Sequence, residues 1–337
     1  MRRDPFEDNA EISRRTCLSL VGAVLLLGGC DGSRGKSGGP GGDPSGWPRT
    51  IAGARGPVTL PRPPQRVVST SVTLTGTLLT IEAPVVASAA TQGRSDVADD
   101  RGFFTQWGEV AQARGVKPLY AGEPNVESVA GMAPDLIVVA GTGGDSALRV
   151  LDQLSQIAPT LVVDYGDKSW QELAVLLGQA VGKEAKAAEA IAGFERKVAE
   201  TARAIKLPPQ PTTAMVYYED GSGANIWTPV SAQGKLLRAL GFTLAAIPPE
   251  VQATEAMGRR SDVVQVTGEQ FAAALNGETV LLFAANEDAV RAVRGNRFLA
   301  HVPAVKAGRV HAMGRDTFRL DYYSAHGFLE RIAAMFA

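Results

Sequence analysis

The sequence predicts an α/β protein made of two lobes that are joined by one long helix. Two observations carry this prediction. Short apolar, β-branched runs alternate with helical segments over most of the chain, and one amphipathic segment, residues 183–206, divides this alternation in two. Short apolar runs between helical segments are typical of parallel strands that are buried on both faces. An α/β fold with mostly parallel sheets follows.

The start of the chain has the layout of an export signal, which we assign to residues 1–29. A charged beginning precedes an apolar run over residues 17–27, and small residues precede Cys30. The run is too short to span a membrane, which takes about 20 residues. The four residues that end at Cys30 resemble a bacterial lipobox, so we expect lipidation of this cysteine after cleavage. Arg14 and Arg15 leave the general secretory and twin-arginine routes both open.

Residues 30–48 are rich in Gly, Ser and Pro, a composition that predicts a flexible tether. The first lobe is then expected over residues 49–182. Strands are predicted at residues 67–69, 85–87, 136–139 and 161–163, and helices at residues 146–156 and 169–181.

The joining helix is predicted over residues 183–206, after Gly182 and before Pro208. Its expected apolar stripe recurs every three or four residues. The stripe consists of Ala188, Ile191, Phe194 (or Ala192), Val198, Ala202 and Ile205. The second lobe is expected over residues 207–337. Its predicted strands are 214–218, 280–284 and 309–311, and its predicted helices are 232–240, 268–275, 287–294 and 322–336.

Composition narrows the class of protein. Of the 337 residues, 45% are hydrophobic, so wholesale disorder is excluded. The net charge of -1 argues against a nucleic-acid-binding protein, which usually carries a basic excess. Two cysteines cannot build a disulfide scaffold, a four-thiolate zinc site or an iron–sulfur cluster.

Several stretches resemble the helix-linked (class III) substrate-binding proteins of bacterial ABC importers for iron–siderophores, haem and cobalamin. The resembling stretches are residues 66–69, 124–129, 133–137, 142–148, 157–160, 231–234 and 317–325. Residues 142–148, 157–160, 231–234 and 317–325 are the more specific stretches, and they are most similar to members that bind ferric catecholates such as ferric enterobactin. The resemblance implies the class III periplasmic binding protein fold, with two Rossmann-like lobes, and a binding role without catalysis. It also implies no cofactor, since the siderophore itself holds the iron.

A ferric tris-catecholate is a bulky aromatic trianion, so a site for it needs permanent positive charge and aromatic surface. Such a site is expected between the lobes, at the carboxyl ends of the parallel strands. Matching position and chemistry gives the candidate ligand-binding residues Arg94, Trp227, Arg259, Arg260, Arg319 and Tyr322. Phe103, Phe104 and Trp107 fall at helical spacing and are interpreted as packing residues.

The resemblance further implies an ABC permease and its ATPase as partners. Glu127 matches a permease-docking carboxylate of the first lobe, and the corresponding position of the second lobe is assigned to Arg238, which departs from the expected acid. The protein is expected to be an extracytoplasmic monomer, held at the membrane by lipid on Cys30, with no nucleic-acid partner.

Other functions stay open to different degrees. The same fold could bind haem, cobalamin or a hydroxamate siderophore. A bare-metal binding protein would need several converging ligands, yet His301, His311 and His326 all lie in the last 37 residues. An enzyme is not indicated, because the chain has no Gly-x-Ser-x-Gly motif and no full dinucleotide fingerprint.

Overall fold

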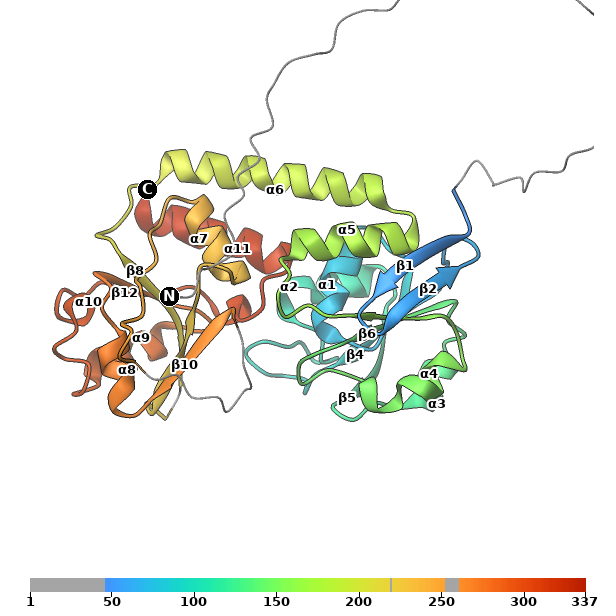
Figure 1. The fold of residues 1–337 in the computed structure, drawn as a ribbon, viewed down its shortest axis with the longest axis horizontal. Coiled ribbons are helices and arrows are strands. Elements are labelled where there is room, and N and C mark those ends of the chain that lie inside the picture. Colours follow the sequence, from blue (N-terminus) through green and yellow to red (C-terminus); the bar gives the residue numbers. More distant parts are fainter. Residues whose placement is uncertain (1–45, 219, 252–260) are drawn as a thin grey trace, which may run out of the picture. The chain divides into compact units, whose positions relative to one another are not determined.

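The computed structural model describes residues 46–218, 220–251 and 261–337. In this part of the chain, two five-stranded sheets form the centres of two lobes. A helix of 21 residues, α6 (Glu184–Ala204), runs along the same edge of both lobes (Figure 1). This arrangement confirms the predicted α/β fold of two lobes and a joining helix.

The first lobe is built on a fully parallel sheet with the strand order β5-β4-β3-β6-β7. All five residues of β6 are buried, as apolar runs covered on both faces require. The strands are β3 (Val67–Ser69), β4 (Val85–Ala90), β5 (Lys117–Ala121), β6 (Leu136–Ala140) and β7 (Thr160–Val163). The helices are α1 (Val72–Thr80), α2 (Thr105–Ala113), α3 (Val126–Ala130), η1 (Leu148–Val150), α4 (Leu151–Ser155) and α5 (Trp170–Val181).

An antiparallel hairpin that the sequence did not predict precedes this sheet. It consists of β1 (Arg49–Gly53) and β2 (Gly56–Leu60), and the amide of Ala54 donates to the carbonyl of Val162 at 2.8 Å. The hairpin therefore covers the edge strand β7, whose unpaired backbone groups would otherwise face water.

The second lobe repeats this layout with the strand order β10-β9-β8-β11-β12. Here β9 runs antiparallel to both of its neighbours, while β8, β11 and β12 are parallel. The strands are β8 (Thr212–Tyr217), β9 (Gly223–Trp227), β10 (Val263–Thr267), β11 (Thr279–Leu282) and β12 (Val310–Ala312). The helices are α7 (Ala232–Ala239), α8 (Glu269–Ala274), α9 (Glu287–Gly295), α10 (Pro303–Lys306), η2 (Arg315–Thr317) and α11 (Tyr322–Phe336).

The boundaries of α5 and α6 follow from local chemistry. Ser169 and Glu172 form a reciprocal capping box at the start of α5, and Gly182 ends this helix in the left-handed region, with φ of 68°. The buried stripe of α6 differs by one residue from the predicted one at two places. Ala187 and Thr201 are buried, whereas Ala188 is exposed and Ala202 is half-buried.

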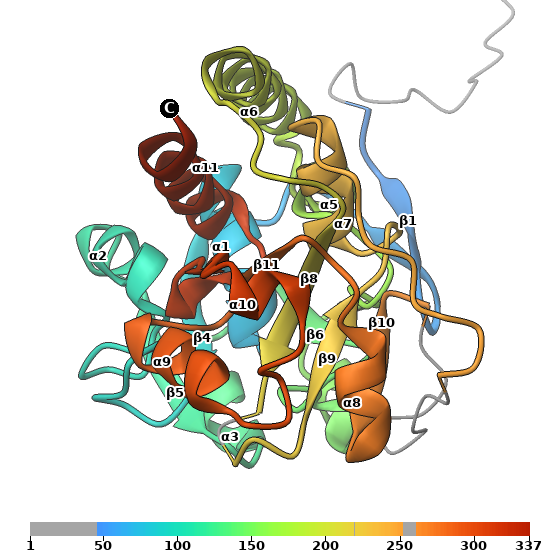
Figure 2. The same ribbon diagram turned by 90° about the vertical axis from the view of Figure 1, so that its left-hand side faces the viewer.

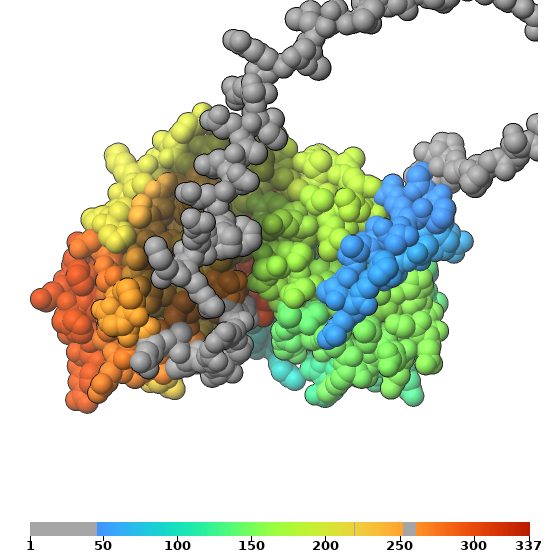
Figure 3. All heavy atoms as spheres, in the orientation of Figure 1, coloured from blue at the N-terminus to red at the C-terminus, as the bar shows by residue number. Residues whose placement is uncertain are grey.

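The lobes are connected a second time by the C-terminal helix. Helix α11 packs against α6 and also against α1 and α2 of the first lobe. Figure 2 shows α11 beside α6 at the edge where the lobes join. In the space-filling view the two lobes form separate masses, from blue to green and from orange to red, with α6 along one edge of both (Figure 3). The cleft between the lobes is therefore closed on the side of these helices.

Candidate functional site

Two cavities lie side by side between the lobes and share four lining residues, Thr73, Phe104, Phe318 and Arg319. Their volumes are about 80 Å³ and about 450 Å³. The smaller cavity is also lined by Tyr165, Lys168, Asn225, Trp227, Gln233, Asp262 and Asp321, and the larger by Thr70, Thr91, Tyr120, Asp145, Ala284 and Arg315. Both lobes therefore contribute to one continuous cleft, as predicted for the carboxyl ends of the parallel strands.

The residues just before Arg319 are held in place by buried hydrogen bonds. Thr317 is fully buried, and its hydroxyl donates to the carbonyl of Gly314 at 2.7 Å. The same hydroxyl accepts the amide of Ala284, directly after β11, at 2.9 Å. A buried hydroxyl with both bonds made holds the loop in one conformation. The end of β11 therefore sets where the arginine enters the cleft.

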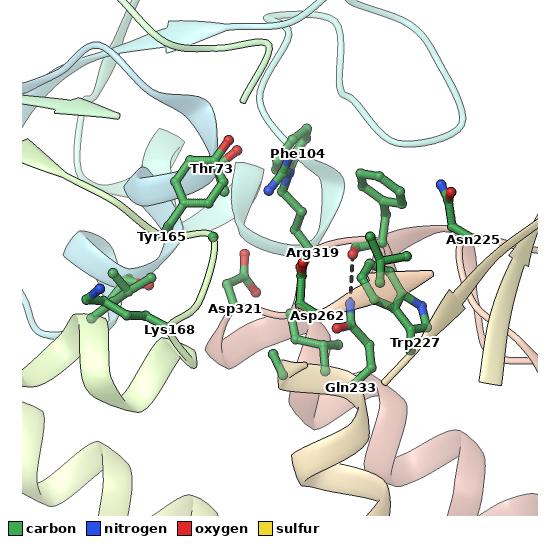
Figure 4. Close-up of a pocket in the computed structure, with 17 residues that line it drawn as sticks. Thr73, Phe104, Tyr165, Lys168, Asn225, Trp227, Gln233, Asp262, Arg319 and Asp321 are labelled. Atoms are coloured by element: carbon green, nitrogen blue, oxygen red, sulfur yellow. Dashed lines mark hydrogen bonds between the residues drawn. The ribbon is translucent and has the colours of Figure 1, made fainter. Parts of the chain in front are cut away.

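The motif of residues 231–234 supports the same segment from helix α7. The side-chain amide of Gln233, which is buried, donates to the carbonyl of Phe318 at 2.8 Å. Figure 4 shows this bond below the guanidinium of Arg319. The resemblance of both motifs to siderophore-binding proteins thus has a physical basis, since one motif holds the other in place.

Arg319 reaches from the second lobe to an aromatic ring of the first. Its guanidinium carbon lies 4.5 Å from the centre of the Tyr165 ring and 5.5 Å from that of Phe318. Within the residues that the structure describes, this guanidinium makes no ion pair or hydrogen bond. An arginine that lies against aromatic rings and has no acceptor among these residues keeps its N–H groups available for an anionic ligand.

Trp227 stands at the end of β9 and lines the smaller cavity. Its ring lies edge-on to Phe318, with a centroid distance of 6.2 Å. The side chain is buried, and its indole N–H finds no acceptor among the described residues. The nitrogen itself is closed off from the cavity, so Trp227 contributes aromatic surface to the cavity wall rather than a donor.

Asp321 is a buried carboxylate at the junction of the lobes. It caps α11 by accepting the amide of Ser324 at 2.8 Å and receives the side chain of Gln106, from the first lobe, at 3.3 Å. The carboxylate lies against Gly76 of α1, where any larger side chain would collide with it. Burial raises the pKa of this carboxyl to about 6, and the bonds from Ser324 oppose the rise.

We expect this residue to make stability depend on pH. Between pH 3.8, the ordinary pKa of an aspartate, and about pH 6, Asp321 is protonated in the folded chain and ionised in the unfolded chain. The favourable contribution of Asp321 to the free energy of unfolding is therefore present at low pH and is lost as the pH rises through 6. Asp321→Asn keeps an acceptor for the helix cap and removes the charge. The variant should therefore gain stability at pH 7.5, by about 2 kcal/mol or a few degrees in Tm, and little at pH 4. Thermal unfolding across this range tests it, with the exposed Asp152→Asn as control. A variant less stable than the parent at pH 7.5 would contradict the raised pKa of the Asp321 carboxyl.

The loop that should supply a basic residue from the first lobe differs from expectation. Arg94 is exposed, has a φ of 54°, and lines neither cavity. Arg101 is bound to Asp99 of its own loop, at 2.7 Å. The loop instead brings Asp96 to Arg315 of the second lobe, 3.2 Å away. This loop therefore contributes an acidic side chain, and not the expected basic one, to its contact with the second lobe.

The other predicted ligand residues fall in two groups. Tyr322 lines neither cavity, and its ring packs edge-on against Trp170 at 5.3 Å and in a tilted arrangement against His326 at 4.4 Å. It belongs to an aromatic cluster beneath α6. Arg259, Arg260 and Cys30 lie outside the described residues.

The sequence profile of the periplasmic binding protein family matches residues 67–317. The chain belongs to this family.

Several members of the periplasmic binding protein family are similar over most of the chain. The ferric enterobactin-binding periplasmic protein FepB of Escherichia coli is 53% identical over 290 residues, which cover 86% of this chain and 91% of that protein. The crystal structure of holo-ViuP is 35% identical, with a TM-score of 0.79, and covers 86% of this chain and 96% of its own. SirA of Staphylococcus aureus, solved with staphyloferrin B, has a TM-score of 0.65 at 20% identity, which shows the shared fold alone.

Several residues of this binding protein's cleft were missed by sequence reasoning. Phe104 was interpreted as packing but lines both cavities, whereas Phe103 and Trp107 are buried packing residues. Tyr165 and Lys168 follow the carboxyl end of β7, and this position was the available signal. The other missed residues are Arg315 and Phe318.

The two predicted docking residues do not lie on a common edge of this binding protein. Helix α7, which carries the exposed Arg238, packs against α6, whereas α3, which carries the exposed Glu127, lies at the opposite edge (Figures 1 and 2). The counterpart of α3 is α8, because α3 connects β5 to β6 and α8 connects the equivalent strands β10 and β11. Each of these two helices has an exposed glutamate in its first turn, Glu127 and Glu269.

Proposed function

We propose that the chain binds a ferric catecholate siderophore of the ferric enterobactin type in the cleft between its lobes. The observation that carries this proposal is the half-buried Arg319, whose guanidinium lies within 5.5 Å of the ring centres of both Tyr165 and Phe318, with its N–H groups unpaired among the described residues. A trianion needs such donors, and its catechol rings need aromatic surface. The 53% identity to a ferric enterobactin-binding protein supports the same ligand class.

The charges and rings of the cleft fit this ligand in more than one place. Lys168 and Arg315 line the two cavities on either side of Arg319. Trp227 and Phe104 add aromatic surface from opposite lobes. Iron would arrive already coordinated by the catecholate oxygens, so the protein's task is to recognise the outer surface of the complex. Binding then requires no chemical step.

Capture should need little movement of the lobes. Helices α6 and α11 both join the lobes, and α6 alone is roughly 30 Å long at the standard helical rise. Two helical connections restrict hinge motion. A cleft that is largely formed before the ligand arrives loses little conformational entropy on binding.

Titration with ferric enterobactin, followed by the quenching of tryptophan fluorescence, tests the proposal directly. We expect saturable binding with a dissociation constant below the micromolar range, since Trp227 lines the cleft. Ferrichrome, an uncharged ferric hydroxamate, serves as the control ligand and should bind at least tenfold more weakly, because it offers no anionic charge to the arginines. Absence of micromolar binding to ferric enterobactin would refute the proposed ligand class.

We further propose that the loaded protein delivers its ligand to an ABC permease through Glu127 and Glu269. Both are exposed, and both begin helices on the edge away from α6. A pair of like charges on equivalent helices suits a two-fold partner with basic residues at matching places.

We also propose that the chain is exported and anchored to the membrane by lipid. The charged start, the short apolar run and the lipobox-like ending at Cys30 support an exported chain held at the membrane by lipid on this cysteine. None of the helices in the described residues is long and apolar enough to cross a bilayer.

A further inference from the structure

One conspicuous sequence motif, residues 142–148, has no part in the function described so far. It follows β6 and places Asp145 at the wall of the larger cavity. One oxygen of this carboxylate accepts the hydroxyl of Tyr165 at 2.8 Å. The other accepts the hydroxyl of Ser71 at 2.5 Å and the amide of Thr73 at 3.0 Å. The carboxylate therefore ties Tyr165 to the first turn of α1.

Gly143 provides the space in which the Tyr165 hydroxyl lies. Its φ is 90°, a conformation that favours glycine, and a Cβ at this position would overlap the hydroxyl oxygen. The tyrosine side chain is 6% exposed. Its ring is therefore fixed at both ends, by the backbone two residues after β7 and by the bond to Asp145.

The fixed ring of Tyr165 is in contact with the guanidinium of Arg319, from the opposite lobe. Burial, together with the charge of Asp145, raises the pKa of the Tyr165 hydroxyl, so the phenol stays neutral and its ring face remains a partner for a cation. The guanidinium lies 4.5 Å from the ring centre. A cation–π contact of this kind uses no N–H group as a hydrogen-bond donor to an acceptor atom, so the five donors stay available to other partners.

We propose that Tyr165 is a positioning residue for ligand binding, whose ring, held by Asp145 and Gly143, keeps the guanidinium of Arg319 where both cavities can use its donors. This inference rests on the proposed function for its ligand. The contact itself joins the two lobes within the described residues, so it can be measured separately from ligand affinity.

The test compares Tyr165→Phe with Tyr165→Leu. Phenylalanine keeps the ring and loses the bond to Asp145, whereas leucine loses the ring. Affinity for ferric enterobactin should fall no more than about threefold in the first variant and about tenfold or more in the second. In an Arg319→Ala background, Tyr165→Leu should cost less than about twofold further, because a positioning residue acts only through the group it positions. Additive losses, or unchanged affinity in Tyr165→Leu, would overturn the inference.

A second measurement needs no ligand. The Nε–H resonance of Arg319 in the ligand-free protein should show an aromatic ring-current shift to which Tyr165 and Phe318 both contribute. Tyr165→Phe should keep the full shift, and Tyr165→Leu should remove the larger part of it. A shift of unchanged size in Tyr165→Leu would overturn the role of Tyr165. If the parent protein does not bind ferric enterobactin, the proposed function fails, while this resonance still decides the role of Tyr165.

Discussion

Replacement of Arg319 by alanine should weaken the binding of ferric enterobactin by about 100-fold, or about 3 kcal/mol. The guanidinium is half-buried, lies over two rings, and has no carboxylate partner among the described residues. A trianion would supply the missing acceptors, so the variant loses charge-assisted hydrogen bonds that form only with ligand. Titration by tryptophan fluorescence gives the measurement.

Three controls sharpen this result. Arg319→Lys keeps the charge but not the planar stacking, so it should fall between the parent and the alanine variant. Arg203→Ala, on the exposed face of α6, should bind as tightly as the parent protein. Ferrichrome binding should change far less than ferric enterobactin binding in Arg319→Ala. An equal loss for both ligands would contradict a role in charge recognition.

Charge reversal at both proposed docking residues should reduce iron uptake at least tenfold and leave ligand affinity unchanged. The double variant Glu127→Arg and Glu269→Arg places like charges opposite a basic partner on both lobes, and each such contact costs several kcal/mol. Neither residue lines the cleft. Uptake of radioactive iron as ferric enterobactin, measured beside the affinity of the purified variant, separates delivery from capture.

Arg238→Glu is the informative control, because α7 lies on the edge beside α6. We expect it to transport iron normally, and Glu200→Arg on the exposed face of α6 to do the same. Normal uptake by the double variant, or a defect in Arg238→Glu of similar size, would show that the docking edge lies elsewhere.

Much of the fold could be predicted from local signals. Helix α11 was predicted with its observed bounds, and α5 within one residue, because a capping box and a left-handed glycine mark the ends of α5. The stripe of α6 was less certain. Ala187 and Ala188 are chemically identical, and only contact with the lobes decides which one is buried. The buried Thr201 shows the same limit, since its polarity hides it from an apolar pattern.

The site was harder to predict than the fold. Trp227 and Arg319, which line the smaller cavity, were selected from the family resemblance, and Arg319 also follows a predicted strand. Tyr165 was missed because its role depends on three residues that are distant in the sequence, among them Ser71 and Asp145. Strands β9 and β10 were not predicted, and with them the antiparallel direction of β9 was missed. Long-range geometry of this kind leaves no local trace.

The position of α11 has a consequence for how the protein is made. The last fifteen residues before the end of the chain join the lobes and are capped by Asp321, which lies against the first lobe. A chain emerging from its N-terminus can complete the first sheet early, but α11 can pack against α1, α2 and α6 only after the strands of both lobes have been made. A product truncated before Tyr322 would carry every strand of both sheets and still lack the second helical contact between the lobes. The placement of one lobe against the other would then depend on α6 alone.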